Sequence, residues 1–259
     1  MDLGLTDQVV FVAGSSRGIG RAIACALLTE GARIVLTGRD ADSLERARAE
    51  IAQADSQARI LAIRADLTDA ASARDCIDRT ISHFGRLDHL VANLGNGSGT
   101  PGPTPPDTDW TRLFEMNFFA SVRLTEYCLP HLHANPLGGS ILYISSIAAL
   151  ETTPAPLPYS AAKAALTNYA KNLSRHLAPQ RIRVNTIAPG NIFFAGGSWE
   201  LHLNNRRDAV EAMLRNEVPQ QRFGSPEDVA SLAAYLCSSH ASFSTGATYV
   251  VDGGQTHSI

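Results

Sequence analysis

The sequence predicts an α/β fold, a doubly wound and mainly parallel β-sheet in a single domain over residues 1–259. Short apolar runs with the pattern of buried strands alternate with longer segments that have the pattern of helices. Such alternation is typical of parallel strands joined by right-handed crossovers, with helices on both faces of the sheet. The 259 residues are 44% hydrophobic, enough for a substantial core, and contain no repeat or linker that would mark a second domain.

The first two strand–helix pairs set this pattern. A continuous apolar run over residues 8–13 ends in glycine, and the helical pattern over 19–30 is closed by Gly31. The apolar run at 33–37 is the second predicted strand, and the charged, amphipathic stretch 41–54 is the second predicted helix.

The alternation continues to the end of the chain. We predict strands at 59–65, 87–92, 139–144, 182–187 and 248–252, and helices at 72–84, at about 109–132 and from about Pro158 onward. The helix near Pro158 follows a proline-studded loop and opens an alanine-rich stretch, which favours that start. A helix is also expected before each of the last two strands.

Two segments break the alternation. Residues 95–109 are crowded with glycine and proline, and residues 190–197 are aromatic and rich in glycine. Both follow predicted strands, and folds of this kind bind ligands at the carboxyl ends of their strands. We therefore expect both segments to overhang the ligand site, with a substrate lid at about 190–217.

Composition excludes several classes of function. The formal charge of -3 offers no basic surface for nucleic acid, and no apolar run approaches the length of a membrane span. No histidine or cysteine cluster has the spacing of a metal site, so we expect no metal. The absence of a signal-peptide pattern and the wide separation of the cysteines indicate free thiols in a cytoplasmic protein: Cys25, Cys76, Cys128 and Cys237. The expected partner is a small molecule.

A glycine-rich loop follows the first predicted strand and opens the first helix. Its backbone amides and the helix N-terminus would face a phosphate, and its glycines allow a close approach, as in a dinucleotide-binding site. The loop contains Gly14, Ser16, Arg17, Gly18, Ile19 and Gly20. A plain tight turn is the alternative, because the spacing Gly-x3-Gly-x-Gly differs from the commoner Gly-x-Gly-x2-Gly.

The end of the second strand predicts the cofactor. An NAD site usually places an acid there against the ribose 2′-hydroxyl, whereas this chain has Thr37, Gly38 and Arg39. Arg39, together with Arg17, could clamp a 2′-phosphate by charge-assisted hydrogen bonds, which favours NADP. Asp40 is close enough to leave NAD open, and both arginines could simply be solvated.

Three side chains near the fifth strand could together protonate a carbonyl. Tyr159 lies four residues before Lys163, so the two share a helix face, and Ser146 lies thirteen residues before the tyrosine. A free tyrosine titrates near about 10, and a neighbouring ammonium would lower that pKa toward neutral pH. Chance could produce the pair. However, the basic residues of the chain are overwhelmingly arginine, and the only two lysines are Lys163 and Lys171. The compact ammonium of a lysine is not interchangeable with the planar guanidinium of an arginine.

Together these residues resemble the short-chain dehydrogenase/reductase family, over residues 9–254, and the resemblance implies its Rossmann fold. The family's glycine motif matches here with Ala13 in place of the usual threonine. The other matching positions are the adenine-side pair Asp66 and Leu67, a degraded motif at Asn93 and Gly95, the helix residue Asn117, and the stretch Pro189, Gly190 and Ile192 beside the nicotinamide carboxamide.

The resemblance implies a role for each catalytic residue. Tyr159 would be the general acid in reduction, and Lys163 would lower its pKa and hold the nicotinamide ribose. Ser146 would bind the substrate oxygen, and Asn117 would order a proton-relay water beside the lysine. The C-terminal signature at 251–254 often lies near a subunit contact and implies a homotetramer.

Simpler interpretations stay open for some of these residues. Asn117 could be a helix side chain with its hydrogen bonds satisfied, and Ser146 could cap the strand end. Asp66 or Thr68 could be the N-cap of the next helix. Phe194 stands where the family often has a threonine or serine, so one cofactor hydrogen bond would be missing or replaced.

The predicted substrate pocket is largely apolar. Its roof and floor would be formed by Phe193, Phe194, Gly196, Gly197 and Trp199 above, and by Ala148, Leu150 and Thr153 below. This lining favours an apolar or aromatic carbonyl compound. Trp199 could instead pack in the core or in a subunit contact. An acidic carrier protein would bind to a basic rim around the pocket, and Arg206 and Arg207 are only a weak candidate for such a rim.

Three functions follow from these observations. The first is an NADPH-dependent reductase of ketones or 3-oxoacyl thioesters, because the chain looks most like the 3-oxoacyl-carrier-protein reductases and general ketone reductases of the family. The second is an alcohol dehydrogenase that uses the same residues for oxidation, in a secondary-metabolite or sugar pathway. The third is a sensor or scaffold that binds NADP(H) without turnover, against which the complete set of catalytic residues argues.

Overall fold

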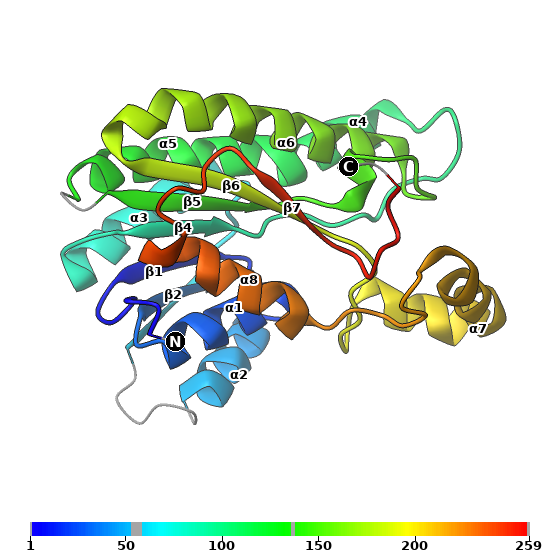
Figure 1. Cartoon of the computed structure of the whole chain (residues 1–259), viewed down its shortest axis with the longest axis horizontal. Helices are drawn as coiled ribbons and strands as arrows, with labels where there is room; N and C mark the ends of the chain where they lie inside the picture. Colours follow the sequence, from blue (N-terminus) through cyan, green and yellow to red (C-terminus); the bar gives the residue numbers. More distant parts are fainter. Residues whose placement is uncertain (1, 53–58, 136–137, 258–259) are drawn as a thin grey trace.

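The computed structural model describes residues 2–52, 59–135 and 138–257. These residues form one seven-stranded parallel sheet in the order β3-β2-β1-β4-β5-β6-β7 (Figure 1). The strands are β1 (Val9–Ala13), β2 (Arg33–Gly38), β3 (Ile60–Arg64), β4 (His89–Ala92), β5 (Gly139–Ile144), β6 (Ile182–Pro189) and β7 (Thr248–Val251). The strand order reverses between β1 and β4, which is where doubly wound folds bind their ligands.

Helices cover both faces of the sheet (Figure 1). On one face lie α1 (Gly18–Thr29), α2 (Ala41–Ala52) and α8 (Pro226–Cys237); on the other lie α3 (Ala70–Phe84), α4 (Asp107–Phe114), α5 (Ala120–His133) and α6 (Leu157–Leu177). Side chains alternate along a strand, so Val10 and Val12 of β1 enter one core cluster while Val9 and Phe11 enter the other. Burial on both faces explains why the strands are continuously apolar.

Most predicted elements agree with the structure to within about two residues, and the predicted fold class is confirmed. The last residues of the predicted second helix, 53 and 54, lie outside the described residues. The helix predicted at 109–132 is divided into α4, a π-helical turn η1 (Glu115–Phe119) and α5. Short 3-10 turns cover Ile147–Ala149, Ala178–Gln180 and Ser239–Ala241. In the described parts of the chain, no helix is long and apolar enough to span a bilayer.

The segment predicted as a lid contains a helix that the sequence analysis did not predict, α7 (Ser198–Glu217). Of its 20 residues, all described, only Val210 is buried, and Arg206 departs from helical geometry with φ -154° and ψ 53°. Figure 1 shows α7 at one end of the molecule, apart from the helices that flank the sheet. Weak packing of this kind permits local opening at low free-energy cost, and the lid role stays a prediction.

The N-terminus of α8 generates a prediction about stability. Ser225 Oγ accepts from the Asp228 amide at 3.3 Å, and Asp228 Oδ2 accepts from the Ser225 amide at 2.8 Å, which is a capping box. We expect Ser225→Ala to lower the free energy of unfolding by about 1 kcal/mol, measured by urea denaturation. Ser231→Ala, on the exposed face of α8, is the control and should change it by less. Equal losses would contradict a capping contribution.

Candidate active site

The glycine loop is fixed by contacts to its neighbours. The Ser15 amide donates to Thr37 O at 2.9 Å and the Thr37 amide donates to Ser15 Oγ at 2.9 Å, which joins the loop to the end of β2. Asn93 Nδ2 donates to Gly14 O at 2.9 Å, which joins the loop to the end of β4. A Cβ on Gly14, whose φ is +63°, would lie 2.5 Å from Asn93 O, so the loop requires glycine there.

The start of α1 suits an anionic group. The N-cap residue of α1 is Arg17, and its side chain makes no capping hydrogen bond, so the first amides of the helix have no side-chain acceptor. Amides at a helix N-terminus bind phosphate well. The glycine-loop residues that were predicted to bind the diphosphate of a dinucleotide therefore suit a diphosphate.

The residues that would recognise the cofactor ribose lie beside this loop. A Cβ on Gly38 would be 2.8 Å from Ser16 Cβ, so the end of β2 packs on the loop and Arg39 follows it as an exposed side chain. Asp40 Oδ1 accepts from the Ser43 amide at 2.8 Å, and hydrogen bonds from Ser43 lower the pKa of Asp40. Arg17 Nη1 donates to Gly196 O at 3.0 Å, on the segment before α7.

The predicted adenine-side pair lies after β3. Asp66 Oδ1 accepts from the Thr68 amide at 3.0 Å and from Thr68 Oγ1 at 2.7 Å, and Leu67 is buried. The N-cap of α3 is Asp69, whose side chain accepts from the Ser72 amide. The alternative that Asp66 or Thr68 caps this helix is therefore wrong.

Ser146 and Tyr159 come together at the end of β5. Ser146 is the N-cap of the 3-10 turn at 147–149, and its Oγ accepts from the Ala148 amide at 3.1 Å. It also lies close enough to the side chain of Tyr159, in the first turn of α6, to lower the pKa of that phenol. Ser146 thus does cap a local turn, as the alternative interpretation held, and its hydroxyl still reaches the tyrosine.

Lys163 lies one turn further along α6 and is 4% exposed. Its Nζ donates to Leu94 O at 3.0 Å and to Ile144 O at 2.9 Å. Burial lowers the pKa of Lys163 to about 7. Burial also raises the pKa of Tyr159, and the nearby Ser146 side chain opposes this shift. That Lys163 lowers the pKa of Tyr159 stays a prediction, since desolvation dominates the shift of the phenol here.

Asn117 is fully buried in the π-helical turn. Its Nδ2 donates to Leu113 O at 2.9 Å and to Asn96 O at 3.2 Å, whereas its buried Oδ1 has no hydrogen-bond partner among the described residues. A Cβ on Gly95 would lie 2.1 Å from this Oδ1 and 3.1 Å from Lys163 Nζ, so the two groups converge on Gly95. The alternative of a fully satisfied helix asparagine is wrong, and Oδ1 is free to accept from a water.

Two features of this site were not predicted from the sequence. The first is the π-helical turn that contains Asn117; such turns often occur at functional sites. The second is Gly97, because a Cβ there would be 3.9 Å from the ring of Tyr159. The glycine density of residues 95–109 was the available signal for that approach.

The predicted nicotinamide-side residues lie at the carboxyl end of β6. A Cβ on Gly190 would be 2.7 Å from Asp252 Cβ, so only glycine lets the ends of β6 and β7 approach this closely. Pro189 is the last residue of β6, and Ile192 is 6% exposed and bridges to Gly224.

The lid residues pack differently from the predicted pocket roof. The ring of Phe194 lies against Gly18 of the glycine loop. Trp199 contacts Phe223, with ring centroids 5.2 Å apart, and His202, at 5.4 Å. Ala148 is 7% exposed beside Ser146. Contact of these residues with a substrate stays a prediction.

A cavity of about 360 Å³ has Ile147 and Thr153 in its lining, but not Ser146, Tyr159 or Lys163. Its lining is mainly polar: Glu151, Thr152, Thr153, Arg215, Asn216, Glu217, Gln255, Thr256 and His257, with Ile147, Val218, Pro219 and Gly254. Thr153 Oγ1 is buried and has no hydrogen-bond partner among the described residues. This cavity can therefore accept polar groups.

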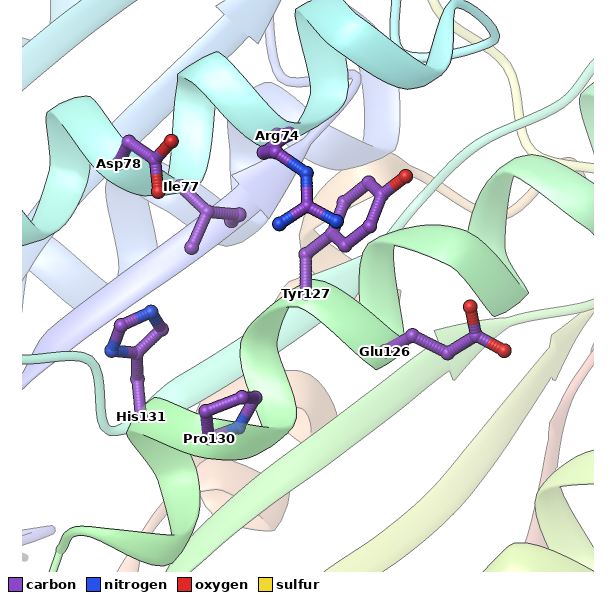
Figure 2. A pocket seen from close by; sticks show the side chains of 7 residues that line it. All are labelled: Arg74, Ile77, Asp78, Glu126, Tyr127, Pro130 and His131. Atoms are coloured by element: carbon purple, nitrogen blue, oxygen red, sulfur yellow. The ribbon is translucent and has the colours of Figure 1, made fainter.

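A second hollow, of about 350 Å³, lies between α3 and α5 and contains none of the predicted site residues (Figure 2). Arg74 stacks over the ring of Tyr127, with its Cζ 4.4 Å from the ring centroid. A cation–π contact of this kind explains why the Arg74 and Tyr127 side chains lie together in Figure 2.

Comparison with known proteins gives consistent matches. A family model described as enoyl-(acyl carrier protein) reductase matches residues 13–256. The 7alpha-hydroxysteroid dehydrogenase of Escherichia coli (strain K12) is 33% identical over 98% of this chain and 96% of its own. Glucose 1-dehydrogenase 2 of Bacillus subtilis (strain 168) is 32% identical over 97% and 96%.

Solved structures match over the same extent. L-sorbose reductase from Gluconobacter frateurii, complexed with NADPH and L-sorbose, has a TM-score of 0.93 at 33% identity and covers 100% of both chains. A 7alpha-hydroxysteroid dehydrogenase complexed with NADH and 7-oxo glycochenodeoxycholic acid has a TM-score of 0.89 at 32% identity, over 99% of this chain and 97% of that chain.

The buried lysine predicts a pH-dependent stability. Because burial lowers the pKa of Lys163 from 10.5 to about 7, the unfolded chain holds more protons than the folded chain between these values. The lysine's contribution to stability should therefore rise with pH across this window. We expect the free energy of unfolding of the wild type, relative to Lys163→Met, to increase between pH 7 and pH 9 in urea denaturation.

Lys171→Met is the matched control, because it removes the chain's other lysine, which is exposed. Its difference from the wild type should change less over the same pH range. The same pH dependence in the two variants would show that burial does not lower the pKa of Lys163.

Proposed function

Because this chain belongs to the short-chain dehydrogenase/reductase family, we propose that it reduces a ketone, or a 3-oxoacyl thioester, to a secondary alcohol with NADPH. Membership rests on the family model that matches residues 13–256 and on relatives 32 to 33% identical over nearly the whole chain. The chain is accordingly an NAD(P)-dependent oxidoreductase that acts on CH–OH groups. The convergence of Ser146, Tyr159 and Lys163 beside the glycine loop carries the proposal.

Each residue has a chemical task in this proposal. The nicotinamide, when bound, supplies the hydride to the carbonyl carbon. Ser146 holds the substrate oxygen, and the Tyr159 hydroxyl donates its proton to that oxygen. Lys163, whose pKa of about 7 lets it exchange protons at neutral pH, restores the tyrosine's proton with a water held by Asn117 Oδ1. The glycine loop binds the diphosphate, and Asp66 and Leu67 hold the adenine.

The preference for NADP rests on the residues around the ribose. The end of β2 carries Arg39 where NAD enzymes carry an acid. The nearest acid, Asp40, already accepts a hydrogen bond from Ser43 at the start of α2. The structural neighbours do not decide this point, since one is complexed with NADPH and another with NADH.

The names of the relatives suggest the direction of the reaction and the class of substrate. They include dehydrogenases of a hydroxysteroid and of glucose and a reductase of L-sorbose, so the second candidate is oxidation of a secondary alcohol by the same residues. A sensor or scaffold would need neither Ser146 nor Tyr159. A cytoplasmic homotetramer stays a prediction from the sequence.

Tyr159→Phe tests the proton-transfer role. The variant keeps the ring but loses the donated proton, so we expect kcat/KM to fall at least about 100-fold. Consumption of NADPH against aryl ketones, acetoacetyl thioesters, keto-sugars and keto-steroids measures this. Tyr169→Phe, on the same helix, is the control and should retain activity. Most of the wild-type turnover in Tyr159→Phe would show that another group supplies the proton.

Arg39→Asp tests the cofactor preference. Loss of charge-assisted hydrogen bonds to the 2′-phosphate should raise the Kd for NADPH about 10- to 100-fold. The Kd for NADH should stay level or fall, because an acid can bind the 2′-hydroxyl. Fluorescence titration with both cofactors measures the change. Arg46→Asp, an exposed arginine on α2, controls for net charge. Equal losses for both cofactors would count against a phosphate clamp at Arg39.

A further inference from the structure

The segment that joins β6 to α7 closes over the glycine loop. We call residues 193–197 the strap. A Cβ on Gly18 would lie 2.7, 2.8 and 2.9 Å from Cζ, Cε2 and Cε1 of Phe194, so the edge of the ring rests directly on Gly18. Arg17 Nη1 donates to the strap carbonyl of Gly196 at 3.0 Å. The strap is thus attached to the loop at two adjacent residues.

The far side of the strap is held by α7. The Gly196 amide donates to Glu200 Oε2 at 2.9 Å, and the Gly197 amide donates to Phe194 O at 3.0 Å, which closes a tight turn. Gly196 therefore contacts the glycine loop through its carbonyl and α7 through its amide. These contacts couple the position of Phe194 to the first turn of α7.

The position of the ring matters because α1 begins at Gly18. A phosphate binds a helix N-terminus through the amides of its first turn, and no side chain caps those amides here. An aromatic ring in van der Waals contact with Gly18 takes the space that such a phosphate needs. It also presents hydrocarbon to a group that requires hydrogen-bond donors.

We propose that Phe194 is a gate on the cofactor site, closed in this structure, and that a dinucleotide binds only after the ring leaves Gly18. The proposal rests on the proposed function only in requiring that a nicotinamide dinucleotide binds. The diphosphate is common to NADPH and NADH, so the gate acts equally on both cofactors. The position of the Phe194 ring thus determines both the association rate and the affinity of the cofactor.

The contacts that hold the strap are few enough to break reversibly. Arg17 is exposed, Phe194 is half-buried, and α7 buries only Val210 among its described residues. A segment held so lightly opens at a free-energy cost well below that of global unfolding. When only a fraction of molecules is open, the apparent affinity for cofactor falls by that fraction.

Stopped-flow binding of NADPH and of NADH tests the gate. The chain has two tryptophans, and Trp110→Phe leaves Trp199, five residues beyond Phe194, as the sole indole reporter. In this background the observed rate should reach a plateau as NADPH increases, because opening of the strap limits binding. Phe194→Ala should remove the plateau. It should raise the association rate and the affinity about tenfold for both cofactors, as expected if about nine-tenths of molecules are closed.

Two further variants isolate the contact. Phe243→Ala is the matched control, because this phenylalanine is fully exposed and lies outside the strap, so the association rate should stay unchanged. Glu200→Ala removes the acceptor of the Gly196 amide outside the cofactor site and should produce a smaller acceleration for both cofactors.

Other outcomes would overturn the gate. Unchanged association in Phe194→Ala and Glu200→Ala would show that the strap does not limit entry. Faster dissociation in Phe194→Ala, without faster association, would show that the ring packs on bound cofactor. If the wild type binds neither cofactor but Phe194→Ala binds both, the gate is supported. Absence of binding by both proteins would overturn the proposed function, and the gate with it.

Discussion

The hydrogen bonds of the buried Lys163 ammonium hold the site together. A cation taken out of water must be matched by acceptors, and here they are the Leu94 carbonyl after β4 and the Ile144 carbonyl of β5. One side chain thereby joins α6 to the ends of two neighbouring strands. Tyr159, one turn earlier on α6, and Ser146, just beyond β5, meet because the lysine holds these elements together.

Glycines complete this arrangement where a side chain would not fit. Gly95 lets the loop after β4 pass against Asn117 Oδ1 and Lys163 Nζ, and Gly14 lets the loop after β1 pass against Asn93 O. Both loops lie at the carboxyl ends of β1 and β4, where the strand order reverses. The proposed phosphate site at α1 and the proposed proton-transfer site at α6 therefore lie near the same end of the sheet, which a reaction between a dinucleotide and a small carbonyl compound requires.

Much of the fold could be predicted because each strand and helix has a local signature. Apolar runs and closing glycines mark β1 and α1, and the spacing of Tyr159 and Lys163 places both on one helix face. What could not be predicted depends on contacts between distant residues. Phe194 rests on Gly18 across 176 positions of sequence, and no local pattern encodes that contact. The N-cap of α3 is Asp69, which the sequence did not distinguish from its neighbours Asp66 and Thr68, the two residues considered for that position.

The shifts in pKa at the centre of the site bear on the direction of the reaction. A tyrosine that serves reduction must carry its proton, whereas one that serves oxidation must act as a phenolate. Burial raises the pKa of Tyr159, which keeps the phenol protonated at neutral pH, and lowers that of Lys163, which weakens the cation that would stabilise a phenolate. Both effects favour the protonated tyrosine. These shifts therefore support the proposed reduction over the alternative of oxidation by the same groups.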